Sequence, residues 1–281
     1  MNASKPSLFC AYIPKPRYLD SPLALLDETR WMVMSLDAQS RPSSNRQLEP
    51  IRRTRYKADI ASVSPVASRA TFEQHEKCFL GVSLENSNFT TAKLASMVRW
   101  ISRRFSHCTV LVGDSIHRLT LESTCGMAPN EAHGRAMELG CEFMEDNLHV
   151  FDEHGGSSEF TFQTCSDVQG GREFSEYHAQ LLAYFEKDGM FRSSVESFGR
   201  AYHRKHSQGV GASELNRRIE ISSEYFLEEF AVFACLERRG AGVMVYPGSF
   251  STLSEIAEGG HPGAPRELQD LIVVSLHLKG R

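Results

Sequence analysis

Two short apolar segments with a helical pattern between them constrain the fold of this chain most. Residues 78–83 (Cys-Phe-Leu-Gly-Val-Ser) and 108–112 (Cys-Thr-Val-Leu-Val) have the length and composition of buried strands. Residues 90–105 lie between them and carry one apolar helical stripe, formed by Leu94, Met97, Val98 and Ile101. Two strands joined by a crossover helix form a βαβ unit, so we expect a parallel sheet.

The alternation of helices and strands continues to the end of the chain. Helical patterns cover residues 129–146, 174–205 with a break near 188–189, and 213–239, while strand patterns cover residues 159–164, 243–246 and 271–278. This order predicts an α/β fold of the doubly wound, Rossmann-like class with a mainly parallel sheet.

The first quarter of the chain has a different composition. Prolines and serines interrupt residues 1–74, and only residues 22–37 carry a helix-like apolar pattern. We therefore predict a flexible N-terminal extension over residues 1–74 and a Rossmann-like catalytic domain over residues 75–281.

Composition excludes several classes of protein. No apolar run approaches the roughly 20 residues of a membrane span, and the N-terminus lacks a signal-peptide pattern, so we expect a cytoplasmic protein. The seven cysteines are scattered without a C-x-x-C pair, which favours reduced thiols over disulfides or a zinc site. The net charge of −4 gives no bulk attraction to nucleic acid, so such a partner would need a local basic patch.

Phosphate-binding motifs are missing from the sequence. No G-x-G-x-x-G follows the first strand, and no G-x-x-x-x-G-K-[ST] occurs anywhere. We therefore expect no ATP, no NAD and no other cofactor.

Two serines follow predicted strands and are candidate nucleophiles. Ser83 stands in a Gly-x-Ser turn that lacks the second glycine of a nucleophile elbow. Ser115 stands in a Gly-Asp-Ser block that resembles GDSL-type esterases, but the candidate Asp-x-x-His pair, Asp146 and His149, lies shortly after the block rather than near the C-terminus. A Gly-Asp-Ser turn after a strand is more often a helix start, so the esterase remains an alternative.

A phenol and a carboxylate share one face of the long helix predicted at residues 213–239. Tyr225 and Glu229 are separated by four residues, so their side chains are neighbours one turn apart. Together they can hold a primary ammonium and relay its proton, although such pairs are also common on half-exposed helices. Tyr246, at the end of a strand, points into the same crevice if the sheet is parallel.

These motifs, in this order, resemble the cyclodipeptide synthase family. The matching stretches are residues 81–89 (Gly-Val-Ser-Leu-Glu-Asn-Ser-Asn-Phe), 110–118 (Val-Leu-Val-Gly-Asp-Ser-Ile-His-Arg), Gly126, 224–229 (Glu-Tyr-Phe-Leu-Glu-Glu) and 245–248 (Val-Tyr-Pro-Gly). The combination of Asn86 with Tyr246-Pro247 mixes the patterns of the two subgroups of the family.

The resemblance implies a fold related to the catalytic domain of class I aminoacyl-tRNA synthetases and a reaction without ATP. Two aminoacyl-tRNAs would react in a ping-pong sequence through aminoacyl-Ser83 and dipeptidyl-Ser83, and a cyclic dipeptide would be released. By the same resemblance, Tyr225 and Glu229 would hold the first amino group, Gly81 and Gly126 would keep the pocket clear, and Asn86 and Tyr246 would shape the site.

Further residues follow from their positions relative to these motifs. We expect an apolar substrate pocket from Phe79, Val110, Val112, Val232 and Met244, although each is equally suited to the core. We expect tRNA contacts from Arg99, Arg103, Arg104, Arg200, Arg204 and Lys205. We expect a monomer. A tRNA-binding protein of the same fold without catalysis is the second alternative.

Overall fold

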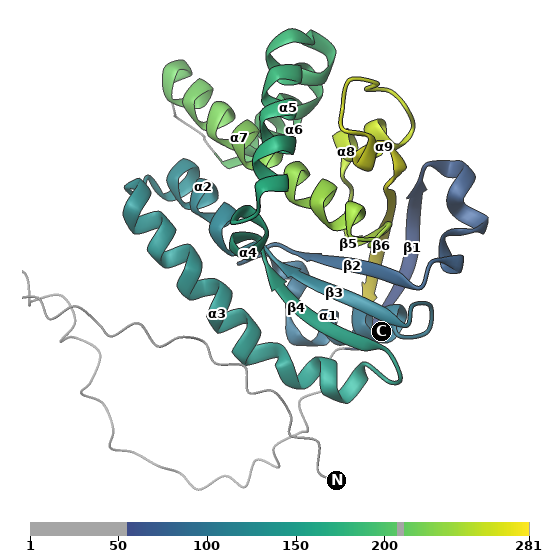
Figure 1. Ribbon diagram of the computed structural model, residues 1–281. Coiled ribbons are helices and arrows are strands. Elements are labelled where there is room, and N and C mark those ends of the chain that lie inside the picture. Colours follow the sequence, from purple (N-terminus) through teal and green to yellow (C-terminus); the bar gives the residue numbers. More distant parts are fainter. Residues whose placement is uncertain (1–54, 207–210, 281) are drawn as a thin grey trace, which may run out of the picture. The chain divides into compact units, whose positions relative to one another are not determined.

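A six-stranded sheet forms the centre of the folded part of the chain (Figure 1). The computed structural model describes residues 55–206 and 211–280. The strands are β1 (Tyr56–Ser64), β2 (Lys77–Val82), β3 (His107–Val112), β4 (Glu159–Thr164), β5 (Val243–Pro247) and β6 (Ile272–Gly280). They lie side by side in the order β1-β6-β5-β2-β3-β4. Five strands are parallel, and the edge strand β1 runs antiparallel to β6.

Helices connect the strands and cover the sheet. They are α1 (Thr91–Ile101), α2 (Asp114–Cys125), α3 (Pro129–His154), α4 (Cys165–Gln169), α5 (Arg172–Lys187), α6 (Gly189–His206), α7 (Ala212–Arg238), α8 (Ser251–Ala257) and α9 (Arg266–Asp270). The predicted strands and helices from residue 77 onward are present, and α5 and α6 are separated at Asp188 as the sequence indicates. None of the described helices combines the length and the apolar character that a membrane crossing needs.

The alternation of side chains along β2 explains why the sheet has helices on both faces. Cys78, Leu80 and Val82 belong to the core shared with α1 and α3. Phe79 faces the other way and joins the core around α7, where its ring lies 5.3 Å from that of Phe233. Successive strand residues point to opposite faces, so both faces of this central strand are buried.

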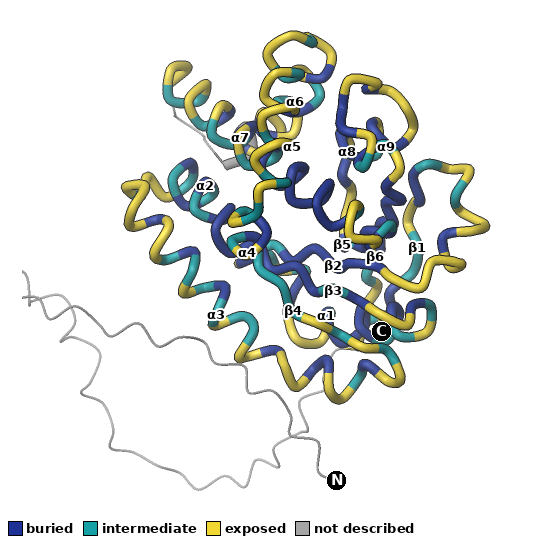
Figure 2. Tube along the Cα trace, in the orientation of Figure 1, coloured by how far each residue is buried: buried dark blue, intermediate teal, exposed yellow. Residues whose placement is uncertain are grey.

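The second half of α7 is buried on almost every side, and Figure 2 shows it in dark blue beside the central strands. An apolar helix of this kind belongs inside a protein. Glu228 is nevertheless buried there, and it accepts two hydrogen bonds from Arg118 of α2, at 3.0 and 2.5 Å. Gln169 of α4 donates a third, at 2.8 Å. A buried carboxylate requires such partners, so this pair fixes α7 against α2 and α4.

The predicted domain boundary at residue 75 is wrong. Tyr56–Ser64 forms β1, which pairs with β6 from Tyr56↔Gly280 to Ser64↔Val273. Val63 and Phe72 are buried in the core around α1. Residues 55–74 therefore belong to the folded unit, and Pro65, the one proline among them, directly precedes a short 3₁₀ helix at Val66–Ala70. The rest of the predicted extension, residues 1–54, lies outside the described residues.

The strand order places a topological switch point between β2 and β5. From β2 the chain moves to β3 on one side, whereas β5 later joins β2 on the other side. In open α/β sheets, ligands bind at the carboxyl ends of the strands at such a point. The residues that follow β2 and end β5 are Ser83 and Tyr246–Pro247.

Candidate active site

The hydroxyl of Ser83 lies at the switch point and contacts a phenol from the neighbouring strand. Ser83 Oγ is 3.0 Å from the Tyr246 hydroxyl. Asn86 Nδ2 donates to the same phenol oxygen at 3.3 Å, and Asn86 Oδ1 accepts from the Asn88 amide at 2.9 Å. Burial raises the pKa of Tyr246 to about 12, against the opposing effect of the Ser83 hydrogen bond. Tyr246 is therefore a neutral phenol at pH 7 and not a base, and either hydroxyl can donate the hydrogen bond between them.

Tyr225 and Glu229 lie one turn apart on α7, as predicted from their spacing. The Tyr225 hydroxyl donates to Glu229 Oε1 at 3.4 Å. Burial raises the pKa of Tyr225 well above its ordinary value, the charge of Glu229 adds to this effect, and a hydrogen bond with Ser83 opposes it. The fold thus brings Tyr225 and Glu229, which lie far from Ser83 in sequence, next to this candidate nucleophile.

Glu229 carries an unsatisfied oxygen in a buried position. Its side chain is only 6% exposed, and Oε2 has no hydrogen-bond partner among the described residues. Burial raises the pKa of Glu229 to about 8, and the hydrogen bond from Tyr225 only partly offsets this. An unpaired buried carboxylate is costly, so this arrangement favours a cationic ligand at Oε2.

A cavity of about 600 Å³ connects these groups. Ser83, Tyr225, Glu229 and Tyr246 all border it. Its volume is in the range of small-molecule sites. The remaining walls come from the loop of residues 83–87, which we call the nucleophile loop, and from α2, α6, α7 and the segment after β5. Aromatic side chains form the apolar part of the wall, contributed by Phe198, Tyr202, Phe226 and Phe250.

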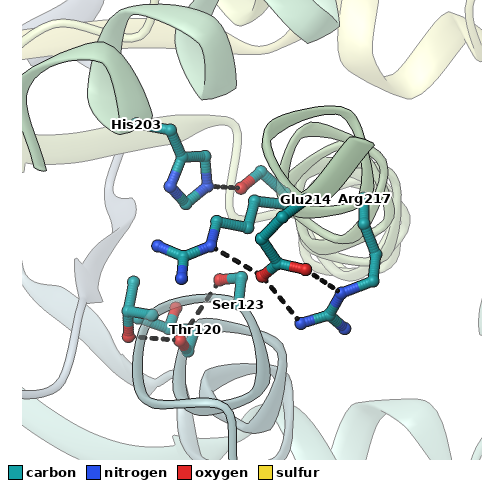
Figure 3. A network of polar contacts seen from close by, with 8 residues as sticks. Thr120, Ser123, His203, Glu214 and Arg217 are labelled. Atoms are coloured by element: carbon teal, nitrogen blue, oxygen red, sulfur yellow. Dashed lines mark hydrogen bonds and ion pairs between the residues drawn. The ribbon is translucent and has the colours of Figure 1, made fainter. Parts of the chain in front are cut away.

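Hydroxyl groups of α2 and paired charges at the start of α7 form a network of polar contacts (Figure 3). Thr120 and Ser123 of α2 border the cavity, and Ser123 Oγ donates to the Thr120 carbonyl at 3.2 Å. Figure 3 shows Glu214 beside Arg217 at the start of α7, with His203 across from them. Hydrogen bonds from Arg217 and Arg218 lower the pKa of Glu214 to about 2. These guanidinium groups are therefore already paired with a carboxylate.

A second acid, Glu85 of the nucleophile loop, and a histidine, His117 of α2, also border the cavity. His117 Nε2 lies 3.1 Å from Glu85 Oε2. Glu85 has φ of 56°, a left-handed conformation. Burial lowers the pKa of His117, although the hydrogen bond with Glu85 opposes this. Both residues are inside the motifs quoted from the sequence, but nothing in the sequence indicated that they pair with each other.

The five residues expected to form an apolar substrate pocket do not border the cavity. All are fully buried: Phe79, Val110, Val112, Val232 and Met244. Phe79, Val232 and Met244 pack in the core around α7, and Val110 packs in the core around α1. The core interpretation left open by the sequence is the one that the structure supports, because the strands of this sheet are covered on both faces and the second half of α7 is buried between neighbours.

The two glycines of the motifs have different surroundings. At Gly81 a Cβ would lie 3.5 Å from Met244 Cε and 3.6 Å from the ring of Tyr246, so this position keeps space beside the phenol. Gly126 caps the C-terminus of α2 with φ of 68°, and no heavy atom lies within 4 Å of a Cβ built there. Gly126 is therefore required by the turn and does not line the cavity.

The esterase alternative has no support at Ser115. Its side chain is 3% exposed and donates to Gln169 Oε1 at 2.6 Å. Asp114 accepts hydrogen bonds from the backbone and side chain of Ser166, at 2.9 and 2.6 Å. The Gly-Asp-Ser block therefore starts α2 and joins it to α4. His149 is exposed on α3 and is not among the residues that line the cavity.

The predicted tRNA contacts fall into two groups that are not brought together. Arg103 and Arg104 follow α1 and precede β3, at the edge of the sheet where strands begin, which is opposite to Ser83. Arg104 stacks over Trp100 at 4.3 Å and pairs with Glu73 at 2.8 Å. Arg99 has its pKa lowered by burial and by the charges of Arg103 and Arg55.

The second group lies on α6, the helix that also carries Phe198 of the cavity wall. Arg200 pairs with Glu196 at 2.5 Å. The side chains of Arg204 and Lys205 lie outside the described residues. Binding of tRNA by either group stays a prediction.

A family model described as cyclodipeptide synthase matches residues 62–239. The chain belongs to the cyclodipeptide synthase family. Membership implies an enzyme that transfers aminoacyl groups. A curated relative, the cyclo(L-leucyl-L-phenylalanyl) synthase of Streptomyces noursei, is 25% identical over 170 residues, which cover 59% of this chain and 70% of the relative.

Solved structures of cyclodipeptide synthases have the same fold. One from Fluoribacter dumoffii has a TM-score of 0.67 and 19% identity, covering 81% of this chain and all of that one. One from Mycobacterium tuberculosis, described as relating cyclodipeptide synthetases to type I tRNA synthetases, has a TM-score of 0.57 and 18% identity over 82% of this chain and 98% of that one. The predicted Rossmann-like, synthetase-related fold is confirmed.

A third structure, from Candidatus Glomeribacter gigasporarum, is described as bound to Phe-tRNAPhe. It has a TM-score of 0.53 and 16% identity, and the match covers 72% of this chain and 86% of that one.

Proposed function

We propose that this chain joins two aminoacyl groups from two aminoacyl-tRNAs into a cyclic dipeptide, with Ser83 as the nucleophile. The observation that carries the proposal is one cavity in which the Ser83 hydroxyl lies beside Tyr246 while Glu229 presents an unpartnered buried oxygen. A hydroxyl nucleophile next to a site for an ammonium is what an aminoacyl ester requires, because such an ester carries both an electrophilic carbonyl and an α-ammonium.

The first step is an exchange of esters. Ser83 Oγ attacks the carbonyl of the first aminoacyl-tRNA, the bond from that carbonyl to the ribose oxygen breaks, and the Ser83 proton is transferred to the departing ribose hydroxyl. The ester bond lost and the ester bond formed are similar in energy, so the step needs no ATP. Tyr246, hydrogen-bonded to Ser83 Oγ at 3.0 Å, holds that oxygen in place.

Glu229 and Tyr225 bind the α-ammonium of the first aminoacyl group. Burial raises the pKa of Glu229 to about 8, so at pH 7 the carboxyl group is mostly protonated, by roughly ten to one. An ammonium at Oε2 compensates the buried charge and returns the group to its carboxylate form. Binding of the substrate therefore satisfies the one buried carboxylate oxygen that has no partner among the described residues.

The remaining steps form the two peptide bonds. The amine of aminoacyl-Ser83 attacks the carbonyl of the second aminoacyl-tRNA, and the ribose oxygen leaves with a proton, which gives dipeptidyl-Ser83. The amine of the second residue then attacks the carbonyl held by Ser83. The new C–N bond closes the ring as the bond to Oγ breaks, and the amine proton replaces the acyl group on Ser83.

The substrate class is supported by chemistry and by relatives. The S. noursei relative is a cyclo(L-leucyl-L-phenylalanyl) synthase, and the G. gigasporarum protein binds Phe-tRNAPhe. The aromatic wall of the cavity, including Phe198, Phe226 and Phe250, suits apolar side chains of the same kind. We infer that at least one of the two amino acids is apolar.

Mass spectrometry of the medium tests the proposal. Cultures of Escherichia coli expressing the wild type should release a diketopiperazine, and cultures expressing Ser83→Ala should release none. Ser115→Ala is the control for the esterase alternative and should leave the product in place. Purified protein mixed with charged tRNA should gain one aminoacyl group on Ser83, detected by intact-mass measurement and peptide mapping.

Two outcomes contradict the proposal. Product that persists in Ser83→Ala would remove Ser83 from the chemistry. Tight binding of charged tRNA by the wild type, with neither acylation nor product, would favour the non-catalytic tRNA-binding protein.

A further inference from the structure

The two carboxylates that border the cavity are Glu229 and Glu85, within the part of the chain that the structure describes. They lie on different walls, Glu229 on α7 and Glu85 on the nucleophile loop. The reaction proposed above brings two α-ammonium groups into this cavity, one on each aminoacyl ester. Each must lose a proton before its nitrogen can attack a carbonyl. Glu229 provides a partner for the first, and the second still needs one.

His117 borders the cavity and is held by a carboxylate. Its Nε2 is held by Glu85 Oε2 at 3.1 Å. A carboxylate accepts hydrogen bonds only, so the ring donates from Nε2 and its Nδ1 carries a lone pair. No described residue forms a hydrogen bond with Nδ1, and the ring borders the cavity. A histidine oriented by a carboxylate, with its other nitrogen open, is the arrangement of a general base.

The backbone at Glu85 gives a second, independent observation. A residue with a side chain in the left-handed conformation costs about 1 kcal/mol or more relative to glycine. This chain carries a glutamate at φ 56°, two residues after the nucleophile. The strained conformation presents the Glu85 carboxylate to His117. Strained residues of this kind concentrate at functional sites.

We propose that His117 and Glu85 receive the α-ammonium of the second aminoacyl group and remove its proton before ring closure. This rests on the proposed function. His117 Nδ1 takes one proton from the –NH3+ group, and Glu85 stabilises the imidazolium that forms. The resulting amine attacks the Ser83 ester, the C–N bond forms as the C–Oγ bond breaks, and the second amine proton goes to Ser83 Oγ. His117 then returns its proton to water in the open cavity.

The other charged residues near His117 on α2 are paired with partners of their own, so Glu85 is the group that stabilises the imidazolium. Arg118, the next residue of α2, is paired with Glu228 of α7. Asp114, one turn earlier, is bound by Ser166 of α4. Glu85 is the charged group that acts on His117, and burial keeps the pKa of the ring below its ordinary value. The imidazole is therefore neutral at pH 7, which a base must be.

Single-turnover experiments that separate the steps test the proposal. Wild type, His117→Gln and Glu85→Gln are mixed with one charged tRNA to measure acylation of Ser83, then with a second to measure release of the cyclic product. We expect acylation within about threefold of wild type in both variants. We expect product release to slow by about 10²-fold or more in His117→Gln, as for removal of a general base, and by about tenfold in Glu85→Gln. The deficit should shrink at pH 9, where an α-amine with pKa of about 8 is already deprotonated.

The chain offers a matched control pair. His107 and Glu159 are 3.3 Å apart, exposed, and lie where β3 and β4 begin, at the opposite edge of the sheet. His107→Gln and Glu159→Gln should leave both steps unchanged. Glu85 is 57% exposed, so Glu85→Gln remains informative if the buried His117 variant fails to fold.

Equal slowing of acylation and release would overturn the proposal, as would unchanged release in Glu85→Gln together with no pH rescue. Failure of the wild type to form aminoacyl-Ser83 is a different result, because it would contradict the proposed function itself.

Discussion

Replacing Glu229 with glutamine should make the protein more stable while it abolishes the reaction. The pKa of Glu229 rises from an ordinary 4.5 to about 8 because the carboxyl group is buried. Each pKa unit corresponds to about 1.4 kcal/mol, so ionising this group in the empty site costs about 5 kcal/mol. A glutamine amide of the same shape never ionises, so the variant is free of that cost.

The sign of the pH dependence follows from the two pKa values of Glu229. Its pKa in the folded state, about 8, lies above the unfolded value near 4.5. Unfolding between these pH values releases a proton, so the wild type loses stability as the pH rises from 4.5 to about 8. Below pH 4.5 the carboxyl group is protonated in both states and contributes no difference.

The net gain is smaller than the full cost of ionisation. The glutamine variant leaves an N–H group without a partner where Oε2 lies, which costs about 1–3 kcal/mol. We therefore expect Glu229→Gln to be stabilised by about 2–4 kcal/mol at pH 8, which raises Tm by roughly 5–15 °C for a domain of this size. Near pH 4.5 the variant should be no more stable than the wild type.

Thermal unfolding of both proteins across pH 4.5–8.5, followed by calorimetry, measures this difference. Comparing the two proteins at each pH cancels the titration of all other groups. A difference in stability that does not change with pH would refute the reasoning, because it would mean that Glu229 is already ionised or solvated in the folded protein. The Glu229→Gln variant should also acylate Ser83 more slowly than the wild type, because it lacks the carboxylate that binds the substrate ammonium.

Three further predictions concern other parts of the molecule. Tyr246→Phe removes the phenol that contacts Ser83 Oγ at 3.0 Å; the loss of one hydrogen bond of about 1–1.5 kcal/mol should slow single-turnover acylation about tenfold, and an unchanged rate would contradict its positioning role. Deletion of residues 1–70 removes β1 and exposes the edge of β6, so we expect insoluble or unfolded protein, whereas deletion of residues 1–52 keeps β1; equal solubility of the two would refute this. Glu228→Gln leaves the half-buried Arg118 charge without its carboxylate and should cost about 2–3 kcal/mol in denaturant unfolding, less than for a fully buried pair, while Arg118→Met combined with Glu228→Leu should recover much of it.

The elements of the fold could be predicted because local pattern and tertiary burial agree there. Residues 78–82 are apolar without interruption, and β2 is covered on both faces. Tyr225 and Glu229 could be paired because helical spacing determines which residues are neighbours. Residues of this kind can be placed from the periodicity of a helix or strand alone.

Other parts depend on contacts that no local pattern encodes. β1 reads as a polar, interrupted segment because an edge strand has few buried residues, and only its pairing with β6 defines it. The pair of His117 and Glu85 depends on a turn that brings the start of α2 beside the nucleophile loop. The five apolar residues predicted to line the substrate pocket lie in the core instead. An apolar residue near a motif is equally suited to a pocket wall and to the core, so sequence alone does not distinguish the two.

The pairing of β1 with β6 has a consequence for how this protein is made. Strand β1 is synthesised first and cannot be paired until β6 has emerged, after every other element of the sheet. The strands from β2 to β5 and their helices can pack in chain order, but the edge strand has no partner until β6 has joined them. Chaperones that hold extended segments therefore have an obvious client in residues 56–64, and synonymous codons that slow translation shortly before residues 272–280 should lengthen the time during which this edge can pair wrongly.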